Sequence, residues 1–192
     1  MKFKIAFPLL LLLITFISCS SSSTTNPVIN VITRAGDFQI ELLIDKAPIT
    51  ATHFLKLVKQ KAYNKASFYR VVKAEDFPSD YNTGVIQGGI YLTGKTLPPI
   101  AHESTKITGL SNTDGIVSMA RTEAGTASTE FFICVGDQSV LDAGRRGTAD
   151  SLGMAAFGKV ISGMKVVKKI LNRPSNGDRL VEPIEIQKIS VN

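Results

Sequence analysis

The chain has 192 residues, of which 44% are hydrophobic and 20% are charged, a composition typical of one globular domain. Its 22 Lys and Arg residues against 16 Asp and Glu residues give a net charge of +6. Two of the basic residues lie at the extreme N-terminus, and the others are too few and too scattered to predict a nucleic-acid-binding surface. Two Cys and two His exclude a structural zinc cluster and a disulfide-rich scaffold.

Residues 1–18 have the pattern of an export signal. Two lysines lie among the first four residues, and residues 5–17 form an apolar run that only Pro8 and Thr15 interrupt. This run is too short to cross a bilayer as a helix and is typical of the core of a signal peptide. Cys19 then follows a serine and precedes six Ser and Thr residues, an order that resembles a bacterial lipoprotein signal.

The resemblance to a lipoprotein signal implies that Cys19 is lipidated and becomes the first residue of the mature protein. Two or more acyl chains would anchor it stably to a membrane, and residues 19–27 would form a flexible tether. Ser20 lacks the acidic character that marks inner-membrane retention in such lipoproteins. We therefore expect an outer-membrane lipoprotein that faces the periplasm. The alternative is a plain secretory signal, whose cleavage would release the domain into solution.

Residues 28–192 are expected to form one mainly β domain. Apolar runs and alternating patterns predict about eight short strands, at 28–33, 38–44, 67–72, 85–89, 116–120, 131–135, 155–161 and 184–191. Two helices are predicted, at 48–61 and 164–171, the first because Pro48 suits an early helical position and apolar residues recur at helical spacing. The order of elements argues against a parallel sheet, and closure into a barrel would remove exposed strand edges.

The usual signatures of hydrolases, metalloproteases and nucleotide-binding loops do not occur in the sequence. Cys134 lies in an apolar run and is interpreted as an inert buried thiol rather than a nucleophile. His53 is assigned a solvated or capping role. His102 and Glu103 are adjacent and suit an acid/base pair, but a surface position is favoured because no nucleophile lies in register. No metal or cofactor is expected.

Arg70 is the polar residue of the predicted strands that most needs an explanation. It shares a strand face with Phe68 and Val72, so its charge must be solvated or paired. An arginine that faces water from an edge strand, a structural ion pair and a functional donor all fit this pattern.

Five motifs, in this order, resemble those of the cyclophilin family of peptidyl-prolyl cis-trans isomerases. They are FYRV at 68–71, IQGG at 86–89, SMAR at 118–121, EFFI at 130–133, and FGKV at 157–160 followed by Gly163-Met164. The resemblance covers residues 28–191 and implies a closed eight-stranded antiparallel β-barrel capped by two α-helices. It also implies a cofactor-free enzyme that binds extended or unfolded Pro-containing polypeptides and rotates X-Pro bonds, here while exported envelope proteins fold. A monomer is expected because the sequence has no heptad repeat and no long apolar stripe.

The resemblance further implies roles for individual residues. Arg70 would be the catalytic donor that stabilises the twisted amide, Gln87 would hold the substrate backbone, and Phe132 would form the floor of a proline pocket. The other substrate-binding positions would be Val85, Ala120, Arg121, Thr122, Glu130, Leu141 and Met154.

The sequence departs from the family pattern in the walls of the expected pocket. Residues 73–84 form a longer loop than is usual, and Gly84-Val85 replaces a Phe-Met pair. Phe77 or Tyr81 would be able to fill the space that this replacement leaves. The aromatic residue usual near Val140 is missing, and Met154 stands where His or Tyr is common. We therefore expect weak binding of the family's cyclic-peptide drug.

Glu130 is a further departure, because the family usually has a glutamine at this position. A carboxylate there is expected to pair with Arg70 or Arg121, which would orient the arginine and partly neutralise it. Together with the altered loop, Glu130 supports an alternative function, a non-catalytic module that binds extended Pro-containing peptides. The presence of Arg70, Gln87 and Phe132 favours the enzyme.

Overall fold

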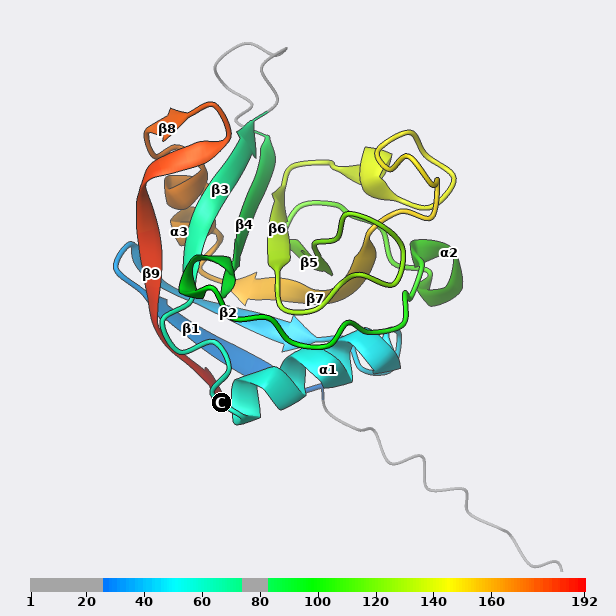
Figure 1. Ribbon diagram of the computed structural model, residues 1–192, viewed down its shortest axis with the longest axis horizontal. Helices are drawn as coiled ribbons and strands as arrows, with labels where there is room; N and C mark the ends of the chain where they lie inside the picture. The colour runs from blue at the N-terminus through cyan, green and yellow to red at the C-terminus, as the bar shows by residue number, and fades with distance from the viewer. Residues whose placement is uncertain (1–25, 74–82) are drawn as a thin grey trace, which may run out of the picture.

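The computed structural model describes residues 26–73 and 83–192, and its strands form a closed antiparallel barrel. The strands are β1 Val28–Thr33, β2 Gly36–Leu42, β3 Ser67–Lys73, β4 Gly84–Gly89, β5 Ile116–Met119, β6 Phe131–Val135, β7 Ala155–Ser162, β8 Ser175–Asn176 and β9 Arg179–Val191. The sheet runs in the order β1-β2-β7-β5-β6-β4-β3-β9-β8, and β9 also pairs with β1 (Figure 1). The predicted eight-stranded barrel is thereby confirmed, with β8 as a short addition that pairs only with β9.

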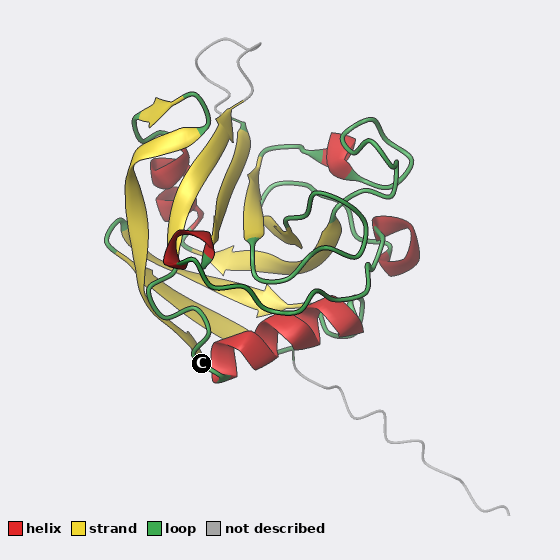
Figure 2. Cartoon of the chain, viewed as in Figure 1, coloured by secondary structure: helices red, strands yellow, loops and turns green. Residues whose placement is uncertain are grey.

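In the described residues, three α-helices and two 3₁₀ turns accompany the barrel. They are α1 Pro48–Lys59, α2 Thr105–Thr108, α3 Met164–Leu171, η1 Tyr91–Thr93 and η2 Ser139–Leu141. α1 and α3 are the two predicted helices, and they lie against different parts of the barrel (Figure 2). The single-turn α2 was not predicted, because a helix of four residues is too short to show an apolar period.

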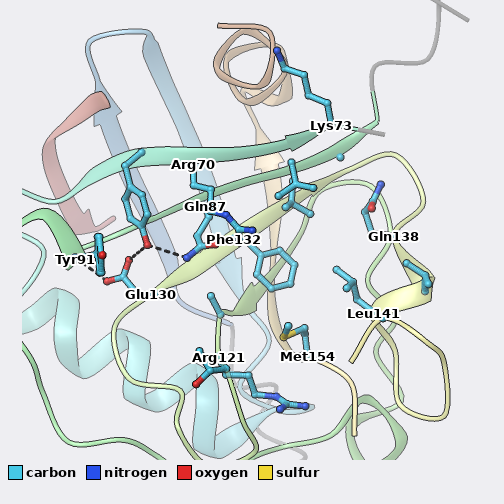
Figure 3. Close-up of a pocket in the computed structure, with 18 of the residues that line it drawn as sticks. Arg70, Lys73, Gln87, Tyr91, Arg121, Glu130, Phe132, Gln138, Leu141 and Met154 are labelled. Carbon is cyan, nitrogen blue, oxygen red and sulfur yellow. Dashed lines mark hydrogen bonds between the residues drawn. The ribbon is translucent and has the colours of Figure 1, made fainter. Parts of the chain in front are cut away.

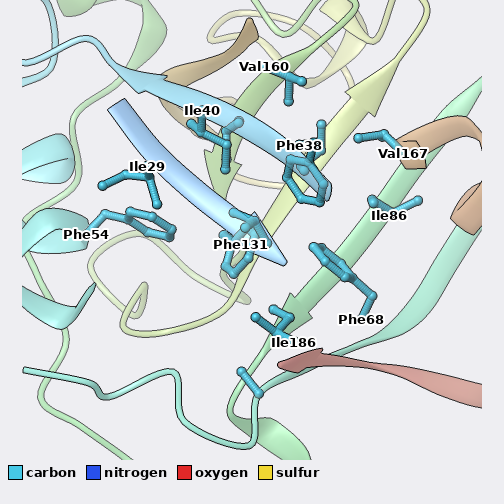
Figure 4. Close-up of a cluster of buried hydrophobic side chains, with 14 of the residues drawn as sticks. Ile29, Phe38, Ile40, Phe54, Phe68, Ile86, Phe131, Val160, Val167 and Ile186 are labelled. Atoms are coloured by element: carbon cyan, nitrogen blue, oxygen red, sulfur yellow. The ribbon is translucent and has the colours of Figure 1, made fainter. Parts of the chain in front are cut away.

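The hydrophobic core fills the barrel and extends to both predicted helices. Along β6, Phe131 and Ile133 belong to this core, whereas Phe132 and Cys134 do not, as the alternation of a strand requires. Phe54 of α1 packs edge-on against Phe131, with ring centroids 5.3 Å apart (Figure 4). Burial of each such aromatic side chain contributes on the order of 1.5–3 kcal/mol to stability.

Several boundaries of the predicted elements move by a few residues. β2 begins at Gly36 rather than residue 38, and α1 ends at Lys59 rather than Lys61, whose φ of +56° leaves the helical region. The largest difference is β9, which begins at Arg179 rather than residue 184. Its first residues pair with β8, a contact that local apolar periodicity does not reveal.

Glu103 closes the N-terminus of α1 and is not the surface residue that was favoured. Its carboxylate accepts hydrogen bonds from the backbone N–H groups of Ile49 and Thr50, at 3.1 and 2.6 Å. α1 has no side-chain cap and no acidic residue in its first turn, so this carboxylate supplies the acceptors and the negative charge that a helix start favours. None of the helices within the described residues has the length and apolarity needed to cross a membrane.

Candidate active site

The predicted Arg70, Gln87 and Phe132 stand in one row across three neighbouring strands. Arg70 of β3 is the register partner of Gln87 on β4, and Gln87 is the register partner of Phe132 on β6. Register partners present their side chains on the same face of a sheet. The row therefore lies on the face of the sheet opposite to the core residues Phe131 and Ile133.

A bulge in β3 directs Arg70 into this row. The register of β3 shifts between Phe68 and Arg70 against both of its neighbours, β4 and β9. A bulge leaves one residue, here Tyr69, outside the regular pairing and changes where the next side chain points. As a result Tyr69 and Arg70 both reach the same outer cavity although they are adjacent in the chain.

The row opens into a cavity of about 720 Å³ that all ten predicted catalytic and substrate-binding residues line. Figure 3 shows Phe132 at its centre, with Gln87 and Arg70 on one side and Leu141 and Met154 on the other. The predicted residues that line it are Arg70, Val85, Gln87, Ala120, Arg121, Thr122, Glu130, Phe132, Leu141 and Met154. The ring of Phe132 supplies an apolar floor, and the hydrogen-bond donors of Arg70 and Gln87 stand beside it. This combination of one apolar pocket with a few fixed polar groups suits a peptide that carries a proline.

The guanidinium of Arg70 is held from two sides and remains partly open to the cavity. Its Nε donates to Asp178 Oδ2 at 2.6 Å, and its Nη1 donates to Gln87 Oε1 at 2.9 Å. Among the described residues these are its two hydrogen bonds, and the side chain is 37% exposed and lines the cavity. Arg70 is therefore both a member of an ion pair and a donor available to a ligand.

Glu130 pairs with neither Arg70 nor Arg121, so the expectation of an ion pair with one of them is wrong. Its Oε2 accepts from the hydroxyl of Tyr69 at 2.7 Å, and its Oε1 accepts from the backbone N–H of Ile90 at 2.8 Å. Gly89 makes room for this carboxylate, because any Cβ there would overlap it and its φ is +152°. Burial raises the pKa of Glu130 above its usual value, and the hydrogen bonds that it accepts oppose this shift.

A chain of hydrogen bonds links Glu130 to Arg70 with a defined direction. Glu130 accepts from the Tyr69 hydroxyl, whose oxygen accepts from Gln87 Nε2 at 2.9 Å. The side-chain oxygen of Gln87 is then free to accept from Arg70. Burial and the hydrogen bond to Glu130 raise the pKa of the Tyr69 hydroxyl well above its usual range, so this hydroxyl stays a donor at neutral pH.

Arg121 lines the cavity, but its charged end points into the neighbouring loop. Its Nη1 and Nη2 donate to the two carboxylate oxygens of Asp150 at 2.6 and 2.9 Å, and its Nη2 also donates to the carbonyl of Gly153 at 2.6 Å. The side chain is only 2% exposed. The guanidinium of Arg121 therefore holds the loop that precedes Met154. It is not free to bind a peptide, although Arg121 does line the cavity.

The far wall of the cavity is built from aliphatic side chains. Val85 of β4, Val140 and Leu141 of η2, and Met154 surround Phe132, and Val140 is half exposed where the family usually has an aromatic residue. Val72 adds another exposed apolar side chain on β3. The replacements suggested for this wall, Phe77 and Tyr81, lie outside the described residues.

The remaining candidates from the sequence have structural contacts rather than places in the cavity. Cys134 is fully buried, and burial raises the pKa of its thiol, which makes it a poor nucleophile. His53 contacts the backbone carbonyl of Ser128 through Nε2 at 2.6 Å, and His102 contacts that of Leu152 at 3.1 Å. In the described part of the chain, no three His, Cys, Asp or Glu side chains gather closely enough to hold a metal ion.

Several residues of the site, among them Tyr69, Tyr91, Asp178 and Arg179, had no role in the sequence-based prediction. Tyr69 and Tyr91 stack with ring centroids 5.3 Å apart, and the Arg179 guanidinium carbon lies 5.3 Å from each ring centroid. Asp178 pairs with Arg70 across 108 positions of sequence. Only Tyr69 lies inside a recognised motif. Tyr91 belongs to η1, Asp178 to the β8–β9 turn and Arg179 to the start of β9, and none of these segments has a motif of its own.

Comparison with known proteins assigns this fold and site to a family. Residues 28–191 match the family of cyclophilin type peptidyl-prolyl cis-trans isomerases. The chain is 36% identical over 177 residues to a peptidyl-prolyl cis-trans isomerase of Acinetobacter baylyi, and the aligned region covers 90% of this chain and 86% of that protein. It is 35% identical over 162 residues to peptidyl-prolyl cis-trans isomerase A of Dickeya dadantii, covering 82% of this chain and 77% of that protein.

Solved structures agree on the fold. A cyclophilin type peptidyl-prolyl cis-trans isomerase of Cryptosporidium parvum superimposes with a TM-score of 0.70 at 24% identity, covering 87% of this chain and 98% of that one. A second structure of that protein, in the presence of the dipeptide Ala-Pro, superimposes with a TM-score of 0.68. With the family match and the bacterial relatives, the chain belongs to the cyclophilin family and is a cyclophilin-type peptidyl-prolyl cis-trans isomerase.

Proposed function

We propose that this enzyme accelerates X-Pro rotation with Arg70 as the catalytic donor and acts on exported proteins as they fold in the cell envelope. The uncatalysed rotation is slow because it breaks amide resonance, with a barrier of about 18–20 kcal/mol. In the twisted transition state the proline nitrogen regains a lone pair. A donor fixed beside that nitrogen lowers the barrier, because it interacts more strongly with the twisted amide than with the planar one.

The observation that supports this role is the position of Arg70, whose guanidinium is held by two hydrogen bonds, in the same row as the apolar ring of Phe132. Phe132 offers a surface for the proline ring, and Arg70 stands two strands away in the same row with free N–H groups. Gln87 lies between them and is in place to bind the peptide backbone. The relative from Cryptosporidium parvum was solved with Ala-Pro, which supports a Pro-containing peptide as the ligand.

A role in the envelope is supported by the N-terminal segment. Residues 1–18 have the pattern of an export signal, and Cys19 is the proposed site of lipid attachment. Six residues lie between Cys19 and Asn26, where the described chain begins, and a fully extended segment of this length spans at most about 25 Å. A tether of this length would keep the site near a membrane, where newly exported chains with slow X-Pro bonds emerge.

The test is an isomerisation assay on a short Ala-Pro peptide with the full chain purified in mild detergent. Arg70→Ala serves as the paired variant. We expect clear turnover by the unchanged chain and a loss of about 100-fold in the variant, the size seen when one transition-state donor is removed. Absence of turnover by a folded chain that still binds the peptide would instead support the non-catalytic peptide-binding module. Mass spectrometry of the exported protein tests lipidation at Cys19.

A further inference from the structure

The β8–β9 turn carries a carboxylate that contacts the proposed catalytic donor. Asn176 of β8 pairs with Arg179 of β9, so Gly177 and Asp178 form a two-residue turn. Gly177 adopts the left-handed φ of +57° that such a turn requires. The backbone carbonyl of Asp178 accepts from Val71 N–H at 2.8 Å, which ties this turn to β3 directly beside Arg70.

The strand register places a second arginine opposite Arg70. Arg70 of β3 is the register partner of Arg179 of β9. Like charges directly opposite each other in a sheet repel, and this repulsion would push the flexible Arg70 side chain away from its neighbour. The carboxylate of Asp178 lies between the two, with Oδ2 2.6 Å from Arg70 Nε and Oδ1 4.0 Å from Arg179 Nε.

The contacts of Arg70 determine which of its donors a substrate can use. A guanidinium has five N–H groups. Asp178 takes the one on Nε, and Gln87 takes one on Nη1. The remaining groups lie at the outer end of the fork, where Arg70 lines the cavity beside Gln87 and Phe132. Because the guanidinium is planar, fixing Nε and Nη1 also fixes the direction of these free groups.

We propose that Asp178 is a positioning residue for Arg70: its carboxylate holds Nε and screens Arg179, so that the free end of the guanidinium faces the bound X-Pro bond. The proposal rests on the proposed function, because it assumes that Arg70 is the donor in that reaction. The hydrogen bond from Arg70 also keeps the pKa of Asp178 below its usual value, so the carboxylate is charged at neutral pH. Asp178 itself does not contact the reacting atoms.

The test uses the full chain in mild detergent and measures kcat and KM on a short Ala-Pro peptide. The variants are Asp178→Ala, Asp178→Asn, Arg179→Ala and the double variant Asp178→Ala/Arg179→Ala. Arg70→Ala reports on the proposed function. Glu182→Ala is the matched control, because Glu182 is an exposed carboxylate on the same strand and does not line the cavity.

We expect Asp178→Ala to lower kcat three- to tenfold with KM changed less than twofold, because orientation matters most in the transition state. Asp178→Asn keeps an oxygen acceptor without the charge and should fall between Asp178→Ala and the unchanged chain. Removing Arg179 in the Asp178→Ala background should restore at least half of the lost activity, since it removes the repulsion. A purely structural role of the turn predicts no such rescue. The NMR signal of the Arg70 Nε–H should shift in Asp178→Ala and stay in place in Glu182→Ala.

Three results would overturn the proposal while leaving the proposed function intact. The first is a kcat for Asp178→Ala within twofold of the unchanged chain while Arg70→Ala loses tenfold or more. The second is an Asp178→Ala loss that the Arg179→Ala change does not reduce. The third is a loss fully explained by a smaller folded fraction in circular dichroism at the assay temperature. Lack of turnover by the folded, unchanged chain would refute the proposed function itself.

Discussion

Arg70 and Arg121, two of the three described arginines that line the cavity, each donate to an aspartate, but their guanidinium groups are in very different states. Arg121 is 2% exposed and gives four hydrogen bonds, to both carboxylate oxygens of Asp150 and to the carbonyl of Gly153. Arg70 is 37% exposed and gives one hydrogen bond to Asp178 and one to Gln87. Both were predicted as site residues. A pocket-lining arginine supports chemistry only while some of its donors stay free, so we expect activity to depend on Arg70 and loop stability on Arg121.

The largest expected effect tests whether the guanidinium fork of Arg70 is needed. In Arg70→Lys the charge stays, but an ammonium cannot hold Asp178 and Gln87 in the same planar geometry while it faces the substrate. We expect kcat/KM to fall at least tenfold, which corresponds to about 1.4 kcal/mol of barrier. The measurement is peptide isomerisation, with Arg121→Lys as the matched change. Equal losses of activity in Arg70→Lys and Arg121→Lys would contradict the prediction that activity depends on Arg70 rather than on Arg121.

The next effect concerns stability rather than turnover. Arg121→Ala leaves the Gly153 carbonyl without its buried donor, so we expect the free energy of unfolding to fall by about 1–3 kcal/mol. Urea denaturation measures this change, and hydrogen exchange should show faster exchange in residues 148–153. Activity measured on the folded protein should stay within threefold. A variant as stable as the unchanged chain would show that Arg121 does not hold this loop.

A smaller effect tests the aliphatic wall opposite Arg70. Val140 is half exposed, and the aromatic residue that the family usually has near this position is missing, so we expect the cyclic-peptide drug of the family to lose an apolar contact. We expect a dissociation constant above about 1 µM, that is, binding weaker than about −8.2 kcal/mol. Val140→Trp should tighten binding several-fold in calorimetry, and Val181→Trp on exposed β9 serves as the control. Sub-micromolar binding by the unchanged chain would contradict the prediction.

The smallest effect concerns how the free energy of unfolding depends on pH through Glu130. This carboxylate lines the cavity and, unlike Asp150 and Asp178, accepts no hydrogen bond from an arginine. Burial raises its pKa in the folded state, so the folded chain holds this proton more tightly than the unfolded chain. Its contribution to stability is therefore complete below the unfolded pKa and is lost as pH rises through the folded pKa.

This dependence can be measured by comparing Glu130→Gln with the unchanged chain. The variant has no proton to lose, so its stability relative to the unchanged chain should rise as the pH increases above about 4.3, the ordinary pKa of a glutamate. Urea unfolding across this range gives the difference at each pH. Glu123→Gln, at an exposed carboxylate, is the matched control. A difference that stays constant with pH would refute the raised pKa.

Most of the barrel was predictable from residue pattern because its strands are either alternating segments, such as β1 and β2, or short continuous apolar runs, such as β5 and β6. In the Phe131 to Val135 segment, position along the strand already separates core side chains from those of the opposite face, since strand geometry imposes a period of two. The α2 turn and the start of β9 were missed for the converse reason. α2 has only four residues, and the start of β9 pairs with the two-residue strand β8. Neither segment is long or apolar enough to show a hydrophobic period in the sequence.

The site divides in the same way. Arg70, Gln87 and Phe132 lie in recognisable motifs, and the register that aligns them follows from strands that must pair along their length. The partners of Arg70, Arg121 and Glu130 were not predictable, and the two arginine pairs expected for Glu130 do not form. A charged side chain has many candidate partners in a sequence, and only the folded chain decides which of them come within hydrogen-bond distance.

The residue pattern and the motifs were therefore sufficient for the fold class, the family and ten of the residues that line the cavity, but not for Tyr69, Tyr91 or Arg179. Periodicity and motifs are local properties, and a barrel built from paired strands converts them into one row of facing residues. The folded structure was needed to show that Asp178 meets Arg70 across 108 positions while Asp150 saturates Arg121. Those distances arise from the bulge in β3 and the turn before β9, whose geometry follows from the closure of the whole sheet.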